Sequence, residues 1–206
     1  MPRTIVIVDY GSGNIFSMYN ALNHISKDKI IISNSLEVIR DAYRIVIPGV
    51  GAFGEVKLKL TGVPEMIDLI SQRKSDGVPI LGVCVGMQIM ADVGHEFGIN
   101  AGLAWIPGEV KKIIVDPPFK IPHVGWTPTF HNGHTIFNGI SQNSDFYYLH
   151  SFSMQVKNPE NVIATVNYGK PLVAVVAQDN VLGTQFHPEK SGINGLKLLA
   201  NFCKGI

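Results

Sequence analysis

The sequence predicts an α/β fold with a mainly parallel central sheet, flanked by helices and extended by antiparallel strands. Two apolar runs, residues 5–8 (IVIV) and residues 45–47 (IVI) of the strand predicted at 44–47, are typical of strands buried on both faces of a parallel sheet. Toward the other end, three closely spaced apolar runs are separated by the turn residues 167–169 (NYG) and 179–180 (DN). Turns of this kind between short strands indicate antiparallel hairpins.

Length, charge and cysteine content limit the class of protein. The 206 residues are expected to form one domain, residues 1–206, because no linker, repeat or low-complexity tract divides them. With 17 Lys+Arg against 16 Asp+Glu the net charge is +1, and no basic patch points to a nucleic acid partner. There is no leader pattern and no apolar run long enough to cross a membrane. The two cysteines form no disulfide framework, so a cytoplasmic protein is expected.

The N-terminal segment is predicted to alternate strands with helices. The strand at residues 5–8 leads through residues 9–14 (DYGSGN) into a helix for which Asn14 is a suitable N-cap. A G-x-G-x-x-G nucleotide site is excluded here, because Phe16 stands where the third glycine belongs. The apolar stripe of this helix comprises Ile15, Met18, Tyr19, Leu22 and Ile25.

A glycine-rich segment follows the strand at residues 44–47. Residues 48–54 (PGVGAFG) contain three glycines, which indicates that the backbone there approaches another group closely. An amphipathic pattern then predicts a helix that Gly77 ends. The expected order is strand 29–33, helix 35–43, strand 44–47, loop 48–54, helix 63–73 and strand 78–81.

Residues 82–88 (GVCVGMQ) are the stretch around which the chain is organised. Cys84 lies between the strand at 78–81 and a predicted helix, residues 87–93, which the next glycine is expected to end. Glycines two places before and two places after give the spacing of a nucleophile elbow, with Cys where hydrolases carry Ser. A helix N-terminus favours thiolate over thiol, and the Val85 N–H can point at a carbonyl oxygen under attack. A lone buried cysteine is more often an ordinary core residue, so the functional interpretation needs partners for the thiol.

The C-terminal half is less regular. Predicted strands occupy residues 109–115, 146–152, 162–166, 172–178 and 181–185. Periodicity assigns no element to residues 121–126 (IPHVGW), and Asn132-Gly133 predicts a hairpin turn. His131 and His134 beside that turn have no third ligand in view, so no metal and no cofactor is expected. The closing helix, residues 191–203, is expected to turn inward Ile193, Leu196, Leu199, Ala200 and Cys203.

The residues Phe186-His187-Pro188-Glu189 can provide the partners of the cysteine. A residue before proline is pushed into extended backbone, where residues i and i+2 project to the same side. His187 and Glu189 should therefore point one way, as a general base and the carboxylate that orients it. Taken alone, His-Pro-Glu is a common surface turn. Together with the elbow and with a glycine loop that can supply a second oxyanion N–H, it completes the parts of one mechanism.

With these residues the chain resembles the class I (triad) glutamine amidotransferases. The resemblance rests on a Cys elbow that is followed by Gln88 and on the distal His-Pro-Glu. It implies a flavodoxin-like α/β fold. Five stretches narrow the resemblance to glutaminase subunits that supply ammonia to a (β/α)₈-barrel cyclase in histidine biosynthesis. These stretches are residues 9–14, 48–53 (PGVGAF), 122–126 (PHVGW), 148–152 (YLHSF) and 187–191 (HPEKS).

The resemblance implies a role for each matching residue. The triad would be Cys84, His187 and Glu189, with Cys84 attacking the side-chain amide of L-glutamine to give a γ-glutamyl thioester and ammonia. The oxyanion hole would be formed by Gly49, Val50 and Val85. Glutamine would be held by Gly51, Gln88, Glu96, His150, Ser151 and Phe152. The cyclase partner of a heterodimer would be faced by Asn14, Trp126, Lys190 and Ser191.

Two alternatives of the same chemistry stay open. One is a paralogous glutaminase subunit that feeds another ammonia-dependent synthase, for example in surface-sugar modification. Thr127 bears on this alternative, because the family usually has Asn at that position beside the expected interface. The other is a stand-alone γ-glutamyl hydrolase, against which Gln88 and the partner-facing stretches argue. A non-catalytic binding module is disfavoured by the intact triad.

Overall fold

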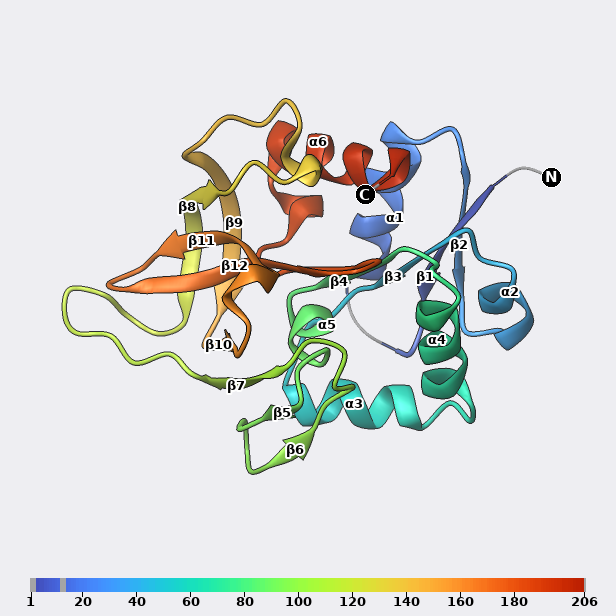
Figure 1. Cartoon of the computed structure of the whole chain (residues 1–206), viewed down its shortest axis with the longest axis horizontal. Coiled ribbons are helices and arrows are strands. Elements are labelled where there is room, and N and C mark those ends of the chain that lie inside the picture. The colour runs from blue at the N-terminus through green and yellow to red at the C-terminus, as the bar shows by residue number, and fades with distance from the viewer. Residues whose placement is uncertain (1–2, 12–13, 206) are drawn as a thin grey trace.

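The computed structural model describes residues 3–11 and 14–205, and its strands form two sheets (Figure 1). The main sheet in these residues has the order β2-β1-β3-β4-β13-β12-β11-β8-β9. Its strands are β1 Thr4–Val8, β2 Lys29–Ser33, β3 Arg44–Ile47, β4 Ile80–Val83, β8 His123–His131, β9 Ser144–His150, β11 Val162–Asn167, β12 Pro171–Gln178 and β13 Val181–Thr184. Neighbours from β2 to β13 run parallel, and those from β13 to β9 run antiparallel. The predicted α/β class, with its parallel sheet and antiparallel extension, is confirmed.

A smaller sheet and the helices complete the fold. The smaller sheet has the order β10-β7-β5-β6, with β5 Val93–Gly94, β6 Asn100–Ala101, β7 Gly108–Lys112 and β10 Phe152–Val156. The α-helices are α1 Ile15–Ile25, α2 Leu36–Arg40, α3 Phe53–Thr61, α4 Met66–Ser75, α5 Val85–Gln88 and α6 Gly192–Lys204. The 3₁₀ turns are η1 Thr135–Phe137, η2 Pro159–Asn161 and η3 Pro188–Lys190. Figure 1 shows α1 and α6 together on one face of the main sheet and α3, α4 and α5 on the other.

Burial explains why the parallel strands are visible in the sequence. Every residue of β3, β4 and β13 is buried, because helices cover both faces of the sheet there. Strand β8 instead alternates between exposed positions and positions that are buried or half-buried. The continuous apolar runs therefore belong to the parallel half of the sheet.

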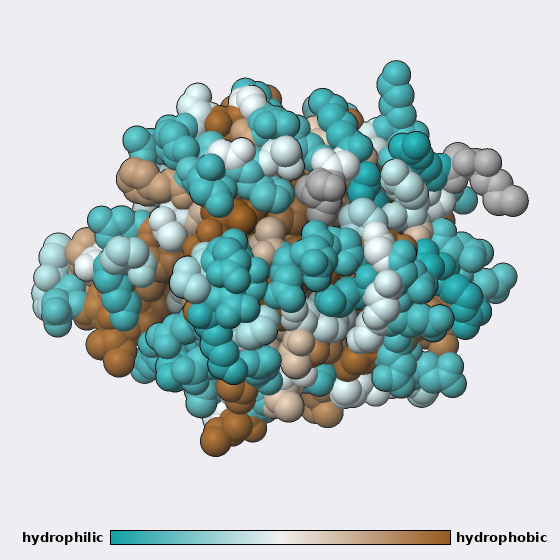
Figure 2. Space-filling model, viewed as in Figure 1, coloured by the Kyte–Doolittle hydropathy of each residue, from teal (hydrophilic) through white to brown (hydrophobic). Residues whose placement is uncertain are grey.

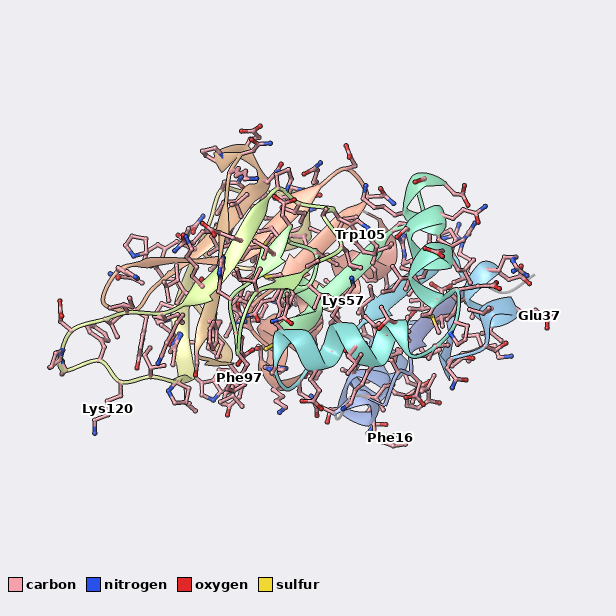
Figure 3. All side chains as sticks on the ribbon, turned by 90° about the horizontal axis from the view of Figure 1, so that it is seen from below. Phe16, Glu37, Lys57, Phe97, Trp105 and Lys120 are labelled. Carbon is pink, nitrogen blue, oxygen red and sulfur yellow. The ribbon has the colours of Figure 1, made fainter. Side chains whose placement is uncertain are left out.

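Some large apolar side chains stay on the surface. Phe97, between β5 and β6, is 94% exposed, and Ile99 beside it is also exposed. Figure 2 shows hydrophobic residues at the lower edge of the molecule, where Figure 1 draws β5 and β6. In Figure 3 the side chain of Phe16 on α1 lies at the rim of the fold, consistent with its exposure.

The helix predicted for residues 87–93 is wrong in length. Helix α5 ends at Gln88, and Gly94 lies in β5 instead of ending a helix. The reason is a competing set of backbone bonds from a distant loop. The Leu103 N–H donates to Ile89 O at 2.7 Å, and the Trp105 N–H donates to Met90 O at 2.9 Å. The carbonyls that would extend the helix are thus taken by a segment that local sequence patterns cannot reveal.

Helix α3 was not predicted, because the glycines of residues 48–54 masked its start. The helix begins at Phe53, whose N–H donates to Glu96 Oε2 at 2.8 Å, and Gly54 lies inside it. An i,i+4 ion pair between Lys59 and Glu55, at 2.8 Å, adds to its exposed face. Helix α4 consequently starts at Met66, later than the predicted residue 63.

The antiparallel half differs from prediction in three places. Residues 121–126, left without an element, run into β8. The strand predicted for residues 146–152 is two strands, because β9 ends at His150 and β10 begins at Phe152 in the other sheet. Asn132-Gly133 is not a two-residue hairpin turn, since η1 also lies between β8 and β9.

The structure also refines the expectations for the first and last helices. Asn14 stands at the N-cap of α1 as expected, but its backbone is left-handed (φ 65°) and its side chain makes no capping hydrogen bond. On α6, Ile193 is 66% exposed instead of inward, and Leu198 and Phe202 take the inward positions. Ser12 and Gly13 of the loop before α1 lie outside the described residues.

Candidate active site

The nucleophile elbow predicted around Cys84 is present. Strand β4 ends at Val83 and α5 begins at Val85, so Cys84 forms the whole turn with φ 56° and ψ −111°. Positive φ is strained for a residue with a side chain and persists only where the surroundings enforce it. The surroundings are backbone at close range: a Cβ on Gly82 would lie 2.5 Å from Gly86 O. A Cβ on Gly86 would lie 2.1 Å from Ile47 O, so both glycines are required by contact.

The predicted base and carboxylate meet beside this elbow. Strand β13 is the parallel neighbour of β4, with Thr184 opposite Val83, so the chain that leaves β13 passes next to Cys84. His187 Nδ1 lies 2.9 Å from Glu189 Oε1, and both side chains are only 2% exposed. The two side chains face each other as expected. The predicted reason for this arrangement, an extended backbone through Glu189, is wrong. The backbone is extended only as far as His187, because residues 188–190 form the 3₁₀ turn η3.

Electrostatics favour a positively charged imidazole at His187. Burial by itself lowers the pKa of His187, because it disfavours the charged ring. Hydrogen bonds and charge interactions with Cys84 and Glu189 act in the opposite direction and raise the pKa to about 10. The ring can therefore accept a proton from a thiol and hold it against a buried carboxylate.

A cavity of about 290 Å³ opens over Cys84 and His187. Its other walls are Val50, Gly51, Val85, Gln88, Glu96, Pro122, Leu149, His150, Ser151 and Phe152. All the predicted glutamine-binding positions thus lie around one cavity with the thiol and the imidazole, while Pro122 and Leu149 were not predicted. Gly49 packs behind the elbow, where a Cβ would lie 2.2 Å from Gly86 N.

Two of the predicted substrate residues also hold the walls together. Gln88 is buried, and its Nε2 donates to Phe152 O at 3.0 Å and to Gln185 Oε1 at 2.9 Å. Glu96 Oε2 accepts the N–H of Phe53 at the start of α3. The sequence did not single out Gln185, because a lone glutamine at the end of a strand carries no signal of its own.

A buried histidine pair supports the wall of the cavity, which one of the two, His150, lines. His150 Nδ1 donates to Phe152 O at 2.9 Å, so its Nε2 accepts from His123 Nδ1 at 3.0 Å. His123 Nε2 then accepts from the Thr127 hydroxyl at 2.8 Å. Burial lowers the pKa of His123 to about 4 and is the main cause of the same value for His150. Both rings are neutral at pH 7, in contrast to His187, and His123 was another residue that sequence reasoning missed.

Comparison with known protein families shows the family to which the chain belongs. Residues 6–206 match the family described as glutamine amidotransferase class-I. The chain belongs to the class-I glutamine amidotransferases. Within the described residues of this amidotransferase, no group of three His, Cys, Asp or Glu side chains is placed to hold a metal ion. None of the helices that the structure describes is long and apolar enough to cross a bilayer.

Individual relatives are similar over almost the whole amidotransferase chain. The Imidazole glycerol phosphate synthase subunit HisH of Rhodospirillum rubrum is 39% identical over 209 residues, covering 97% of this chain and 98% of the relative. The subunit of the same name from Caulobacter vibrioides is 41% identical over 211 residues, covering 98% of each. A crystal structure of a glutamine amidotransferase superposes with a TM-score of 0.74 at 17% identity, covering 97% of both chains. PurLQS from Thermotoga maritima has a TM-score of 0.72 at 20% identity, covering 99% of both chains. The two structures support the fold alone.

The four positions expected at a partner interface fall into two groups in this amidotransferase. Trp126 is 55% exposed, and Lys190 is exposed with its Nζ 6.0 Å from the centre of the Tyr147 ring. Ser191 does not face outward: it is 1% exposed, and its Oγ donates to His187 O at 2.6 Å. Asn14 is partly buried and its Nδ2 donates to Glu189 Oε1. Ser191 and Asn14 thus support the segment that carries His187 and Glu189, and the expectation that Ser191 faces outward is corrected.

Proposed function

We propose that this protein is the glutaminase subunit of an imidazole glycerol phosphate synthase that acts in the cytoplasm as a heterodimer. It hydrolyses L-glutamine to glutamate and ammonia and passes the ammonia to a (β/α)₈-barrel cyclase subunit. There the ammonia is used to make imidazole glycerol phosphate and aminoimidazole carboxamide ribotide in histidine biosynthesis. The names of relatives that match over almost their whole length support the assignment to histidine biosynthesis. The chemistry rests on one observation: a strained elbow cysteine shares a cavity with a buried His187–Glu189 pair.

The proposed reaction uses the three side chains in sequence. His187 takes the Cys84 proton, and the thiolate attacks the side-chain carbonyl carbon of glutamine. His187 returns the proton to the departing nitrogen, which leaves as ammonia, and water then hydrolyses the γ-glutamyl thioester to glutamate. Glu189 accepts the Nδ1–H of His187, which fixes the ring tautomer and stabilises the imidazolium.

The oxyanion of each tetrahedral intermediate needs N–H donors. Val85 is the first residue of α5, and the first N–H groups of a helix have no acceptor within it. We assign this N–H and the peptide between Gly49 and Val50 to the oxyanion hole. Gly51, Gln88 and Glu96 are assigned to the amino-acid end of glutamine, together with the wall at residues 150–152, because all of them line the cavity.

An exposed apolar surface beside the cavity supports a protein partner. Val124, Trp126 and Leu149 are exposed, and β8 pairs with β9 so that Val124 lies opposite Leu149. Ile193 is exposed on α6, whose first residue Gly192 lies beside the Trp126 ring. We call these four residues the apolar rim. Leu149 also lines the cavity, so a partner seated on the rim would lie next to the site where ammonia forms.

Replacement of the nucleophile tests the proposal. In Cys84→Ala, glutamate formation from glutamine should fall by at least ~1000-fold, because the covalent step is lost. The complex with the cyclase should still make product from added ammonium salt. Cys203→Ala is the matched control, since Cys203 lies in α6 away from the cavity and its loss should leave the glutaminase rate unchanged. Unchanged glutamine turnover by Cys84→Ala would refute the catalytic assignment.

The partner is tested separately. Glutamate formation should rise when the cyclase subunit and its ligand are added to this protein. Equal rates with and without the cyclase would favour a stand-alone hydrolase. Capture of a different synthase by this chain from its own cells, with no binding to the cyclase, would favour the paralogous subunit.

A further inference from the structure

The sulfur of Cys84 has a buried neighbour that the proposed reaction does not use. Gln185 follows directly after β13 and is 0% exposed. Its backbone N–H donates to Ala174 O at 2.8 Å, which ties the residue to the neighbouring strand β12. Its side-chain Nε2 lies 3.7 Å from Cys84 Sγ. The amide is therefore held in a fixed place beside the thiol.

The hydrogen-bond partners fix which end of this amide faces the sulfur. Phe152 O can only accept, so the Gln88 atom 3.0 Å away must be its nitrogen. That same nitrogen lies 2.9 Å from the Gln185 amide, so the Gln185 atom on that side must be its oxygen. The NH₂ group of Gln185 consequently points at Cys84. The orientation follows from donors and acceptors and not from an arbitrary choice between two similar atoms.

The two states of the sulfur use this neighbour differently. A neutral thiol can donate its proton, and Leu149 O lies 3.9 Å from Sγ as an acceptor. A thiolate can only accept hydrogen bonds. Once His187 holds the proton, the sulfur therefore requires hydrogen-bond donors. Gln185 supplies an N–H from a fully buried position, where a hydrogen bond to a charged group is strong.

We propose that Gln185 is a positioning residue that donates a hydrogen bond to the Cys84 thiolate and so favours its formation. Gln88 extends the effect, because it anchors the Gln185 oxygen at one side and the cavity wall at Phe152 on the other. The inference rests on the proposed role of Cys84 as nucleophile, and it assigns to Gln185 a function distinct from the oxyanion donors, which act on the substrate.

The test measures ionisation of Cys84 directly. Wild type and Gln185→Met are treated with iodoacetamide from pH 5 to 9, and labelling of the Cys84 peptide is followed by mass spectrometry. Methionine has similar length and no N–H, so the pH midpoint of labelling should move upward by about one unit, which is ~10-fold in the thiolate equilibrium. Gln185→Asn, which keeps the amide but withdraws it by one carbon, should move the midpoint in the same direction.

A matched control separates this effect from general loosening. Gln178→Met makes the same change at the end of β12, where Gln178 Oε1 accepts from Asn161 Nδ2 at 2.8 Å outside the cavity. It should leave the midpoint unchanged. If Gln185→Met is unfolded by circular dichroism, Gln185→Asn decides the question. A folded Gln185 variant with a wild-type midpoint overturns the proposal while leaving the glutaminase assignment intact, since that assignment depends on the Cys84→Ala rate.

Discussion

The parallel and antiparallel halves of the main sheet contribute to the cavity in different ways. The parallel half places Cys84 after β4 and His187 after its neighbour β13. The antiparallel half brings His150 at the end of β9, and the smaller sheet adds Phe152. In the proposed reaction the first set supplies the reacting groups, and the second forms the wall against which substrate would lie.

The two regions are also held by different forces. Around Cys84 the backbone is fixed by close steric contact, since added carbons on Gly82, Gly86 or Gly49 would meet backbone atoms within 2.5 Å. Around His150 the structure is fixed by a chain of neutral hydrogen bonds through His123 to Thr127. A reacting group needs geometry that packing enforces, whereas a wall can be built from polar contacts that tolerate adjustment.

The largest expected effect comes from a glycine in the parallel half. Gly86→Ala would place a carbon 2.1 Å from Ile47 O and displace the elbow. Glutaminase activity should fall by at least ~10,000-fold, because misplacing the Cys84 thiol costs about 100-fold and losing the Val85 N–H as an oxyanion donor costs about 100-fold more. Gly133→Ala is the comparison in the antiparallel half. Gly133 has positive φ (90°) and nothing within 4 Å of an added carbon, so the variant should lose about 1 kcal/mol of stability and keep its turnover rate. Steady-state kinetics and urea unfolding measure both, and similar activity losses would refute the contrast.

The next effect separates the two partners of Cys84. His187→Asn should lower thioester formation by at least ~1000-fold, because the other titratable groups of the described cavity lining are engaged elsewhere. His150 is bound to Phe152 O and His123, and Glu96 Oε2 accepts the Phe53 N–H. Glu189→Gln should lower thioester formation by only ~10- to 100-fold. The Glu189 side chain orients the ring without transferring a proton, and a glutamine there keeps an oxygen for Asn14. Single-turnover kinetics with a γ-glutamyl ester give the comparison. A larger loss in Glu189→Gln than in His187→Asn would reverse the assigned roles.

The histidines of the two halves predict opposite dependences of stability on pH. The pKa of His187 is raised from 6.5 to about 10, so its contribution is complete below pH 6.5 and is lost as the pH rises toward 10. The pKa values of His123 and His150 are lowered from 6.5 to about 4, so their contribution is complete above pH 6.5 and is lost as the pH falls toward 4. The free energy of unfolding should therefore be greatest near pH 6.5.

Urea unfolding at pH 5, 6.5 and 8.5 tests this prediction. His187→Asn should flatten the alkaline side of the curve and leave the acid side unchanged. The range stops below pH 9 because burial raises the pKa of the Cys203 thiol to about 11, which adds a separate loss at higher pH. An alkaline slope that survives in His187→Asn would show that other groups control it.

The smallest effect on the isolated protein is expected at the apolar rim. Trp126→Ala should change the free energy of unfolding by no more than about 0.5 kcal/mol, because the side chain is largely in solvent. Binding to the cyclase should nevertheless weaken, measured by calorimetry. Phe97→Ala is the control, since Phe97 is exposed between β5 and β6 and not in the rim. Equal weakening by the two variants would remove the rim from the interface.

The sequence by itself determined the parallel strands, the elbow and the pairing of His187 with Glu189. Their signals are local: continuous apolar runs arise where both faces of a strand are covered, and glycines two places on either side of Cys84 allow the close backbone contacts of the turn. The cavity positions at residues 88, 96 and 150–152 came from resemblance to a family and lacked such a local signal, whereas the glycines of residues 48–54 marked the loop that contains Val50 and Gly51.

Tertiary structure alone decided the end of α5, the inward orientation of Ser191 and the contact of Gln185 with Cys84. In each case the partner is distant in sequence: residues 103–106 take the carbonyls after α5, Tyr147 binds Ser191 Oγ, and β13 carries Gln185 to the thiol. A hydrogen bond between residues far apart leaves no periodic trace in either segment. Patterns along the chain therefore identified the elbow cysteine and the His187–Glu189 pair, and the folded sheet was needed to show what holds the cysteine in place.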